Sequence, residues 1–137
     1  YSILFIKKAS GPRWKKMRIE EGVLLKEYST FKIGGPARYF VTVTSTIEMQ
    51  QALQWAREKG VDFHILGKGS NSLFSDQGFD GLVIYNKIDH CIFEGQEVIV
   101  GAGFSFSLLG VKTAKASLSG LEFASGIPGS VGGAIFM

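Results

Sequence analysis

Residues 38–72 read RYFVTVTSTIEMQQALQWAREKGVDFHILGKGSNS, and this stretch decides the fold class. The run Arg38–Thr44 is β-branched and aromatic and contains no Gly or Pro, which predicts a strand. Ser45 followed by Glu48 at the third position after it is the capping-box pattern of a helix start. Apolar residues then recur at helical spacing at Met49, Ala52, Leu53 and Ala56, and Gly60 follows at the position of a C-terminal cap. A second strand over Val61–Leu66 completes a predicted β-α-β unit.

The residues that follow add a strand, a hairpin and a second helix. A strand is predicted over Gly81–Tyr85, and Asp89–Glu94 with Glu97–Gly101 predicts a hairpin turning at Gly95-Gln96. An apolar stripe between residues 105 and 118, formed by Leu108, Val111, Ala114 and Leu118, predicts a helix. A β-α-β unit combined with a hairpin predicts an α+β fold with mixed sheets in two small lobes.

Composition and charge divide the chain into two parts. The 137 residues are 45% hydrophobic and 20% charged, which suits one folded domain. The net charge of +3 arises in the N-terminal region, which is rich in Lys and Arg and has no acidic residue before Glu20. We therefore expect residues 1–17 to be a basic extension and residues 18–137 to form the working domain. A basic stripe elsewhere is lacking, so we expect no nucleic-acid partner.

Hydropathy and cysteine usage favour a cytoplasmic protein. The sequence has no apolar run of the roughly 18 residues that a bilayer span requires, so we expect no membrane association. Its single cysteine, Cys91, cannot form an internal disulfide and is expected to be a small buried hydrophobe. His64 lies in an apolar strand and is expected to pack in the core. With His90 distant in sequence, we expect no metal site.

Two glycine-rich loops are the candidate binding elements. Neither contains a P-loop or a Rossmann fingerprint. Successive backbone N–H groups in such loops form a concavity that suits a pyrophosphate, and two loops suit one long ligand. Taken singly, the first loop could be a structural turn and the second a tight connection packed against a helix. The candidate residues are Leu66, Gly67, Lys68, Gly69, Ser70 and Asn71 in the first loop, and Ile127, Pro128, Gly129, Ser130, Gly132 and Gly133 in the second.

Three segments together resemble a known family. They are STFKIGGPA at residues 29–37, LGKGSN at 66–71 and GLEFASGIPGSVGGA at 120–134. In this order they are similar to the UDP-N-acetylenolpyruvoylglucosamine reductases. The resemblance implies a vanillyl-alcohol-oxidase or PCMH-type FAD-binding domain in which the two loops hold the pyrophosphate. It also implies an oxidoreductase of peptidoglycan synthesis, and so of cell wall biogenesis, cell shape and cell division, in which NADPH reduces the flavin and the UDP-sugar substrate becomes UDP-N-acetylmuramate.

The resemblance carries over no catalytic residue. In the family, the serine proton donor and its supporting arginine and glutamate follow later than the position matching Met137. We therefore expect this chain to be the N-terminal, FAD-binding part of a longer enzyme and to be inactive alone. Two alternatives remain at this point. One is another flavin oxidoreductase of the same fold, with His64, His90 or Cys91 as a covalent flavin anchor, and the other is a non-catalytic nucleotide-binding module.

A substitution at Gly69 follows from the loop hypothesis. We expect Gly69→Val to abolish FAD binding, because the valine side chain would occupy the space of the phosphate oxygens.

Overall fold

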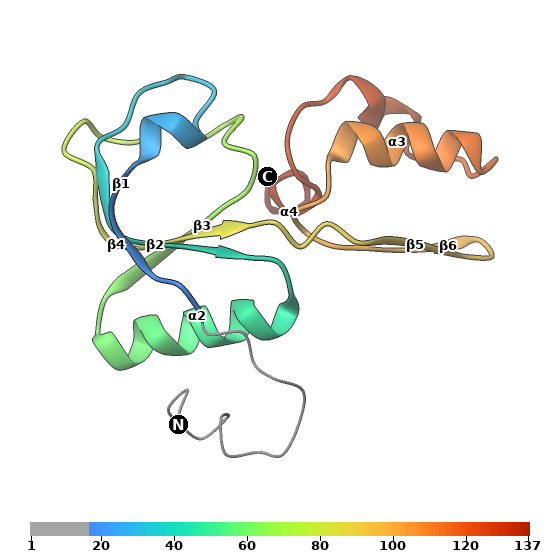
Figure 1. Ribbon diagram of the computed structural model, residues 1–137. Helices are drawn as coiled ribbons and strands as arrows, with labels where there is room; N and C mark the ends of the chain where they lie inside the picture. The colour runs from blue at the N-terminus through green and yellow to red at the C-terminus, as the bar shows by residue number, and fades with distance from the viewer. Residues whose placement is uncertain (1–16) are drawn as a thin grey trace, which may run out of the picture.

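A computed structural model describes residues 17–137, and the basic extension, apart from Met17, lies outside them. The chain forms two lobes (Figure 1). The first lobe contains β1 (Glu20–Leu24), η1 (Leu25–Tyr28), β2 (Pro36–Val43), α2 (Thr46–Lys59), β3 (Asp62–Leu66) and β4 (Phe79–Asn86). The second contains β5 (Cys91–Glu94), β6 (Glu97–Val100), α3 (Phe106–Lys115), η2 (Glu122–Gly126) and α4 (Val131–Phe136). The predicted α+β fold with a mixed sheet is confirmed.

The first lobe is a four-stranded sheet in the order β1-β2-β4-β3. Strands β2, β3 and β4 run parallel, and β1 pairs antiparallel with β2. The predicted β-α-β unit is present, but β4 lies between its two strands. The carboxyl ends of three parallel strands therefore meet at one edge of the sheet, the place where ligands bind in open α/β sheets.

Helix α2 begins and ends where the local sequence predicts. The Ser45 hydroxyl accepts the N–H of Glu48 at 3.2 Å. The Glu48 carboxylate accepts the N–H and hydroxyl of Thr44 at 2.6 and 3.0 Å, so it reaches the residue before the N-cap instead of the N-cap itself. At the other end Gly60 has φ 68°, and its N–H bonds to the carbonyls of Ala56 and Arg57.

The two faces of this sheet have different coverings. Helix α2 covers one face (Figure 1), where Val41, Val43, Leu82 and Ile84 pack against Ala52 and Ala56. The other face carries η1 and an aromatic group formed by Tyr28, Phe40 and Tyr85. The ring centroid of Tyr28 lies 4.7 Å from that of Phe40 and 5.1 Å from that of Tyr85. Tyr28 and Tyr85 of this aromatic group lie near the carboxyl ends of the parallel strands.

Strand β3 is an edge strand, and the expectation that His64 packs in the core is wrong. Its residues 62–65 are exposed, and only Leu66 is buried. The His64 ring is edge-on to Phe74 and Phe79, with centroids 5.6 and 6.2 Å away. Partial burial lowers the pKa of His64 below its ordinary value. The apolar sequence of an edge strand gave no sign that β4 would take the central position.

The second lobe packs α3 on the β5-β6 hairpin, whose predicted turn at Gly95-Gln96 is confirmed. The predicted helix is present as α3, but the apolar stripe that predicts it is not its buried face. Leu108 and Val111 are 45% and 38% exposed, whereas the buried residues are Leu109, Gly110 and Thr113. A Cβ on Gly110 would lie 2.8 Å from the Ser125 nitrogen, so α3 meets the η2 backbone through small residues. Periodicity of large apolar residues does not detect such a contact.

Half-buried Cys91 joins the core of this lobe, which contains Phe104, Leu109 and Val131. In residues 17–137, no helix combines the length and the apolar character needed to cross a membrane.

Candidate functional site

The three sequence segments singled out above come together in space. The first segment bonds to the loop after β3 at three points. The Thr30 N–H donates to the Gly69 carbonyl at 3.0 Å, and the Ser29 hydroxyl to the Ser72 carbonyl at 2.7 Å. Further along, the Gly35 N–H donates to the Ser75 carbonyl at 2.8 Å. The first segment thus supports the loop that carries residues 67–71.

The two glycine-rich loops touch each other across the lobes. A Cβ on Gly67 would overlap the hydroxyl of Ser130, and a Cβ on Gly129 would lie 3.0 Å from the Ser70 Oγ. The second loop is fixed to its own lobe, since the Phe106 N–H donates to the Gly129 carbonyl at 3.0 Å. Glycine at residues 67 and 129 therefore permits the close approach of the loops.

The first loop presents backbone donors that have no protein partner. Within the part of the chain that the structure describes, the N–H groups of residues 68–71 form no hydrogen bond. Gly69 is buried, and a buried N–H without a partner is costly. Consecutive free N–H groups in a loop are the donors that bind phosphate oxygens, and Lys68 in the same loop adds a positive charge. The donor set and the narrow spacing of the loops fit the pyrophosphate of FAD.

In the second loop, the backbone N–H groups of residues 131–133 already have hydrogen-bond partners in the protein. Ser130 is the N-cap of α4, and its hydroxyl accepts the Gly133 N–H at 3.3 Å. The N–H groups of Val131 and Gly132 bond to the carbonyls of Phe104 and Ala102 at 2.9 and 2.8 Å. This loop therefore forms a rigid wall opposite the donors of the first loop.

The structure contradicts the reason given for Gly69→Val. Gly69 has φ +69°, and a Cβ there would point into the Tyr28 carbonyl and not toward the loop's free donors. A valine would disrupt the contact between the two segments of the first lobe. Loss of FAD in that variant would report a damaged fold and not a blocked phosphate site.

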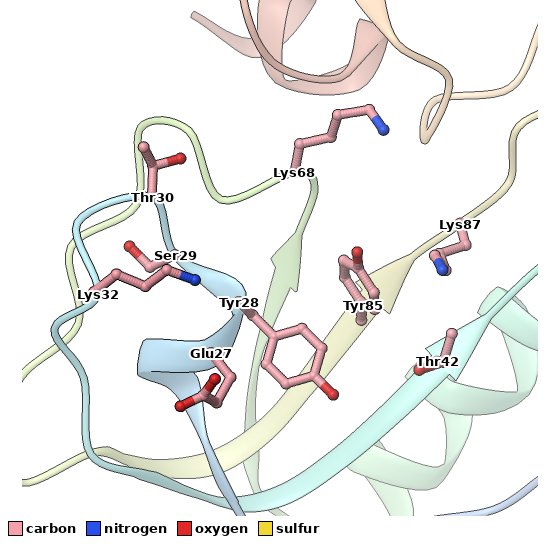
Figure 2. A pocket seen from close by; sticks show the side chains of 9 residues that line it. All are labelled: Glu27, Tyr28, Ser29, Thr30, Lys32, Thr42, Lys68, Tyr85 and Lys87. Carbon is pink, nitrogen blue, oxygen red and sulfur yellow. The ribbon is translucent and has the colours of Figure 1, made fainter.

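Two cavities lie at the carboxyl ends of the parallel strands. The larger, cavity 1, has a volume of about 490 Å³, and its lining is shown in Figure 2. The smaller, cavity 2, has a volume of about 170 Å³ and lies between the lobes. They share Lys68, Tyr85 and Lys87. In Figure 2 the Lys68 side chain extends from the end of β3 away from Tyr28. The cavities therefore adjoin at the loop with free donors.

The predicted site residues have different positions around these cavities. Gly67 and Lys68 line them, whereas Leu66 is fully buried in the core and offers only its backbone. Ile127 and Pro128 are exposed. The sequence reasoning missed the lining residues Tyr28, Lys32, Thr42, Tyr85 and Lys87. Thr42 and Lys87 lie at the ends of parallel strands, a signal that becomes readable only once the strand order is known.

The proposed covalent anchors lie elsewhere. None of His64, His90 and Cys91 lines either cavity. Cys91 packs on the core of the second lobe, and His64 lies on the edge strand. Within residues 17–137, no hydrogen bond or ring contact joins any of the three residues to the two glycine-rich loops.

Comparisons with known proteins give the class of this chain. Residues 37–137 match the family described as the FAD binding domain, so the chain belongs to that family. Two curated relatives of this chain are both UDP-N-acetylenolpyruvoylglucosamine reductases. The protein from Protochlamydia amoebophila is 60% identical over 83% of this chain, and that from Chlamydia felis is 54% identical over 87%. The resemblance found in the three segments is confirmed.

Solved structures agree on the fold. The crystal structure of UDP-N-acetylenolpyruvylglucosamine reductase (MurB) from Thermus caldophilus matches 87% of this chain with a TM-score of 0.67 and 40% identity. Physcomitrella patens BBE-like 1 matches 74% with a TM-score of 0.53 at 23% identity, a likeness in fold alone. The chain spans only 38% and 40% of the two curated relatives and 41% of the Thermus protein.

Proposed function

We propose that this chain binds FAD noncovalently, with the pyrophosphate between the loop at residues 67–71 and the loop at residues 127–133. The observation that carries the proposal is the meeting of these loops at four consecutive N–H groups that have no partner within residues 17–137. Lys68 adds a positive charge at the point where both cavities adjoin the loop. A diphosphate needs both features, because its charge must be neutralised and its oxygens need donors.

We further propose that the chain is the FAD-binding portion of an NADPH-dependent reductase that converts UDP-N-acetylenolpyruvoylglucosamine to UDP-N-acetylmuramate in peptidoglycan synthesis. Support comes from relatives of that name at 54–60% identity. When bound, the flavin supplies hydride transfer from NADPH to the UDP-sugar. The residues of this chain bind and orient the cofactor, and none is assigned a proton-transfer role. The alternative of a covalent flavin through His64, His90 or Cys91 is decided by the acid-precipitation experiment below, because a covalently bound flavin stays with the protein.

Comparing FAD with FMN tests the site directly. FMN carries the same isoalloxazine ring but a single phosphate, so a diphosphate site should bind FAD at least about 10-fold more tightly. Flavin fluorescence is titrated with the purified chain, and acid precipitation then shows whether the flavin is released. Equal affinity for FAD and FMN, or retention of flavin in the acid pellet, would contradict the proposal.

A further inference from the structure

Cavity 1 gathers positive charge from three separate segments of the first lobe. Lys32 comes from the segment before β2, Lys68 follows β3, and Lys87 follows β4 (Figure 2). Among the described residues that line the cavity, Glu27 is the one acidic residue. Within residues 17–137, none of the three lysines forms an ion pair or a hydrogen bond. Their ammonium groups are therefore available to an anionic ligand.

This concentration of charge is local. Residues 17–137 contain ten basic and twelve acidic residues, so the described chain is slightly negative while the cavity lining is positive. A concave site of one charge sign raises the local concentration of ions of the opposite sign. The cavity therefore attracts anions although the domain around it carries a slight negative charge.

The remaining lining suits a ligand that is more than a simple anion. Tyr28 and Tyr85 contribute rings, and the Lys87 Nζ lies 5.5 Å from the centroid of the Tyr85 ring. Among the described residues, the hydroxyls of Thr30 and Thr42 have no hydrogen-bond partner. A volume of about 490 Å³ lies within the range of small-molecule sites. Rings, hydroxyls and cations together match a nucleotide.

We propose that cavity 1 is a second anion-binding subsite for a nucleotide, in which Lys32 and Lys87 attract its phosphate groups from opposite sides of the cavity (Figure 2). The subsite goes beyond the proposed function, because neither lysine belongs to the glycine-rich loops that hold the pyrophosphate. The phosphate has two sources, the FAD molecule itself or a second nucleotide. Both present the same chemistry to the lysines, and the test below distinguishes them.

The test uses ADP as the probe and calorimetry as the readout. The double variant Lys32→Gln/Lys87→Gln removes both charges, and Lys112→Gln/Lys115→Gln removes two exposed charges from α3 as the matched control. We expect ADP affinity to fall at least about 10-fold in the first variant and less than about 2-fold in the control. Raising the salt from about 50 to 500 mM should weaken binding to the parent chain more than to the first variant.

Further measurements show whether the variants fold and whether the phosphate belongs to FAD or to a second nucleotide. Circular dichroism and the melting temperature establish that the variants fold, and Lys32→Arg/Lys87→Arg should keep ADP affinity within about 3-fold because it keeps the charge. If ADP still binds to the FAD-saturated chain, the subsite serves a second nucleotide. If FAD excludes ADP and loses affinity in the glutamine variant, it serves FAD. Unchanged ADP affinity in the folded glutamine variant would overturn the proposal, and the FAD-versus-FMN comparison would still stand. Failure of the parent chain to bind ADP would also overturn it, and the FAD-versus-FMN comparison then shows separately whether the loop site binds a diphosphate.

Discussion

Gly67 and Ser130 belong to different lobes, yet the Ser130 hydroxyl fills the space where a side chain on Gly67 would begin. The same hydroxyl caps α4 by accepting the Gly133 N–H at 3.3 Å. One contact thus ties the end of β3 to the start of the last helix. The spacing of the two glycine-rich loops depends on the absence of a side chain at residue 67.

Gly67→Ala should therefore weaken FAD binding without unfolding the chain. Gly67 does not have a positive φ, so alanine is tolerated by its backbone. The added methyl group displaces the Ser130 side chain, and we expect FAD affinity to fall about 10-fold. Flavin fluorescence titration measures the loss. Gly126→Ala is the matched control, because a Cβ there meets nothing within 4 Å, and it should bind FAD like the parent. Equal affinities of the two variants would contradict this role for the contact.

Gly69→Ala should lower the stability of the fold, and any loss of FAD binding should follow from that destabilisation. Its φ of +69° disfavours alanine, and the Cβ would also overlap the Tyr28 carbonyl. Gly60→Ala provides the comparison, since Gly60 has φ +68° but open space around it. We expect Gly60→Ala to cost about 1 kcal/mol and Gly69→Ala more than about 2 kcal/mol in the free energy of unfolding. Urea denaturation measures both, and similar losses would show that the overlap relaxes.

Sequence reasoning succeeded where the signal is local. The caps of α2 at Ser45 and Gly60 are confirmed because each depends on a few neighbouring residues. The turn of the β5-β6 hairpin is confirmed for the same reason. The two glycine-rich loops, which the sequence predicts to serve one long ligand, lie in contact. Their contact is the part of the candidate site that the sequence could predict.

What the sequence missed depends on contacts between distant segments. The position of β4 between β2 and β3 leaves His64 on an edge strand, although its neighbours in sequence are apolar. Helix α3 is buried through Gly110 and Thr113, which carry little hydropathy signal. The lysines of cavity 1 come from three segments, and nothing in the local sequence of Lys87 marks it as part of a site.

Ser45→Ala should destabilise the first lobe by about 1 kcal/mol. The mutation removes the hydroxyl that accepts the Glu48 N–H at 3.2 Å, so one N–H of the first turn of α2 loses its partner. We expect the melting temperature to fall by about 3–5 °C. Ser119→Ala is the matched control, because Ser119 is exposed and forms no hydrogen bond among the described residues. Equal melting temperatures for the two variants would show that α2 does not depend on this cap.

The His64 ring should make the stability of the chain depend on pH. Burial lowers the pKa of His64, so between that pKa and the ordinary value near 6.5 the unfolded chain binds a proton that the folded chain does not. The stability contributed by the neutral ring is present above about pH 6.5 and is lost as the pH falls through the lowered pKa. His64→Phe keeps an aromatic ring beside Phe74 and Phe79 but removes the titration.

We therefore expect acidification from about pH 7.5 to 5.5 to destabilise the parent chain more than His64→Phe, by a small margin because His64 lies on an exposed edge strand. Urea denaturation of both proteins at several pH values measures the difference in their free energies of unfolding. That difference should be constant above about pH 7 and change below it, since only the parent takes up the extra proton on unfolding. A difference that stays constant across the whole range would show that the edge strand opens enough for His64 to titrate as it does in the unfolded chain.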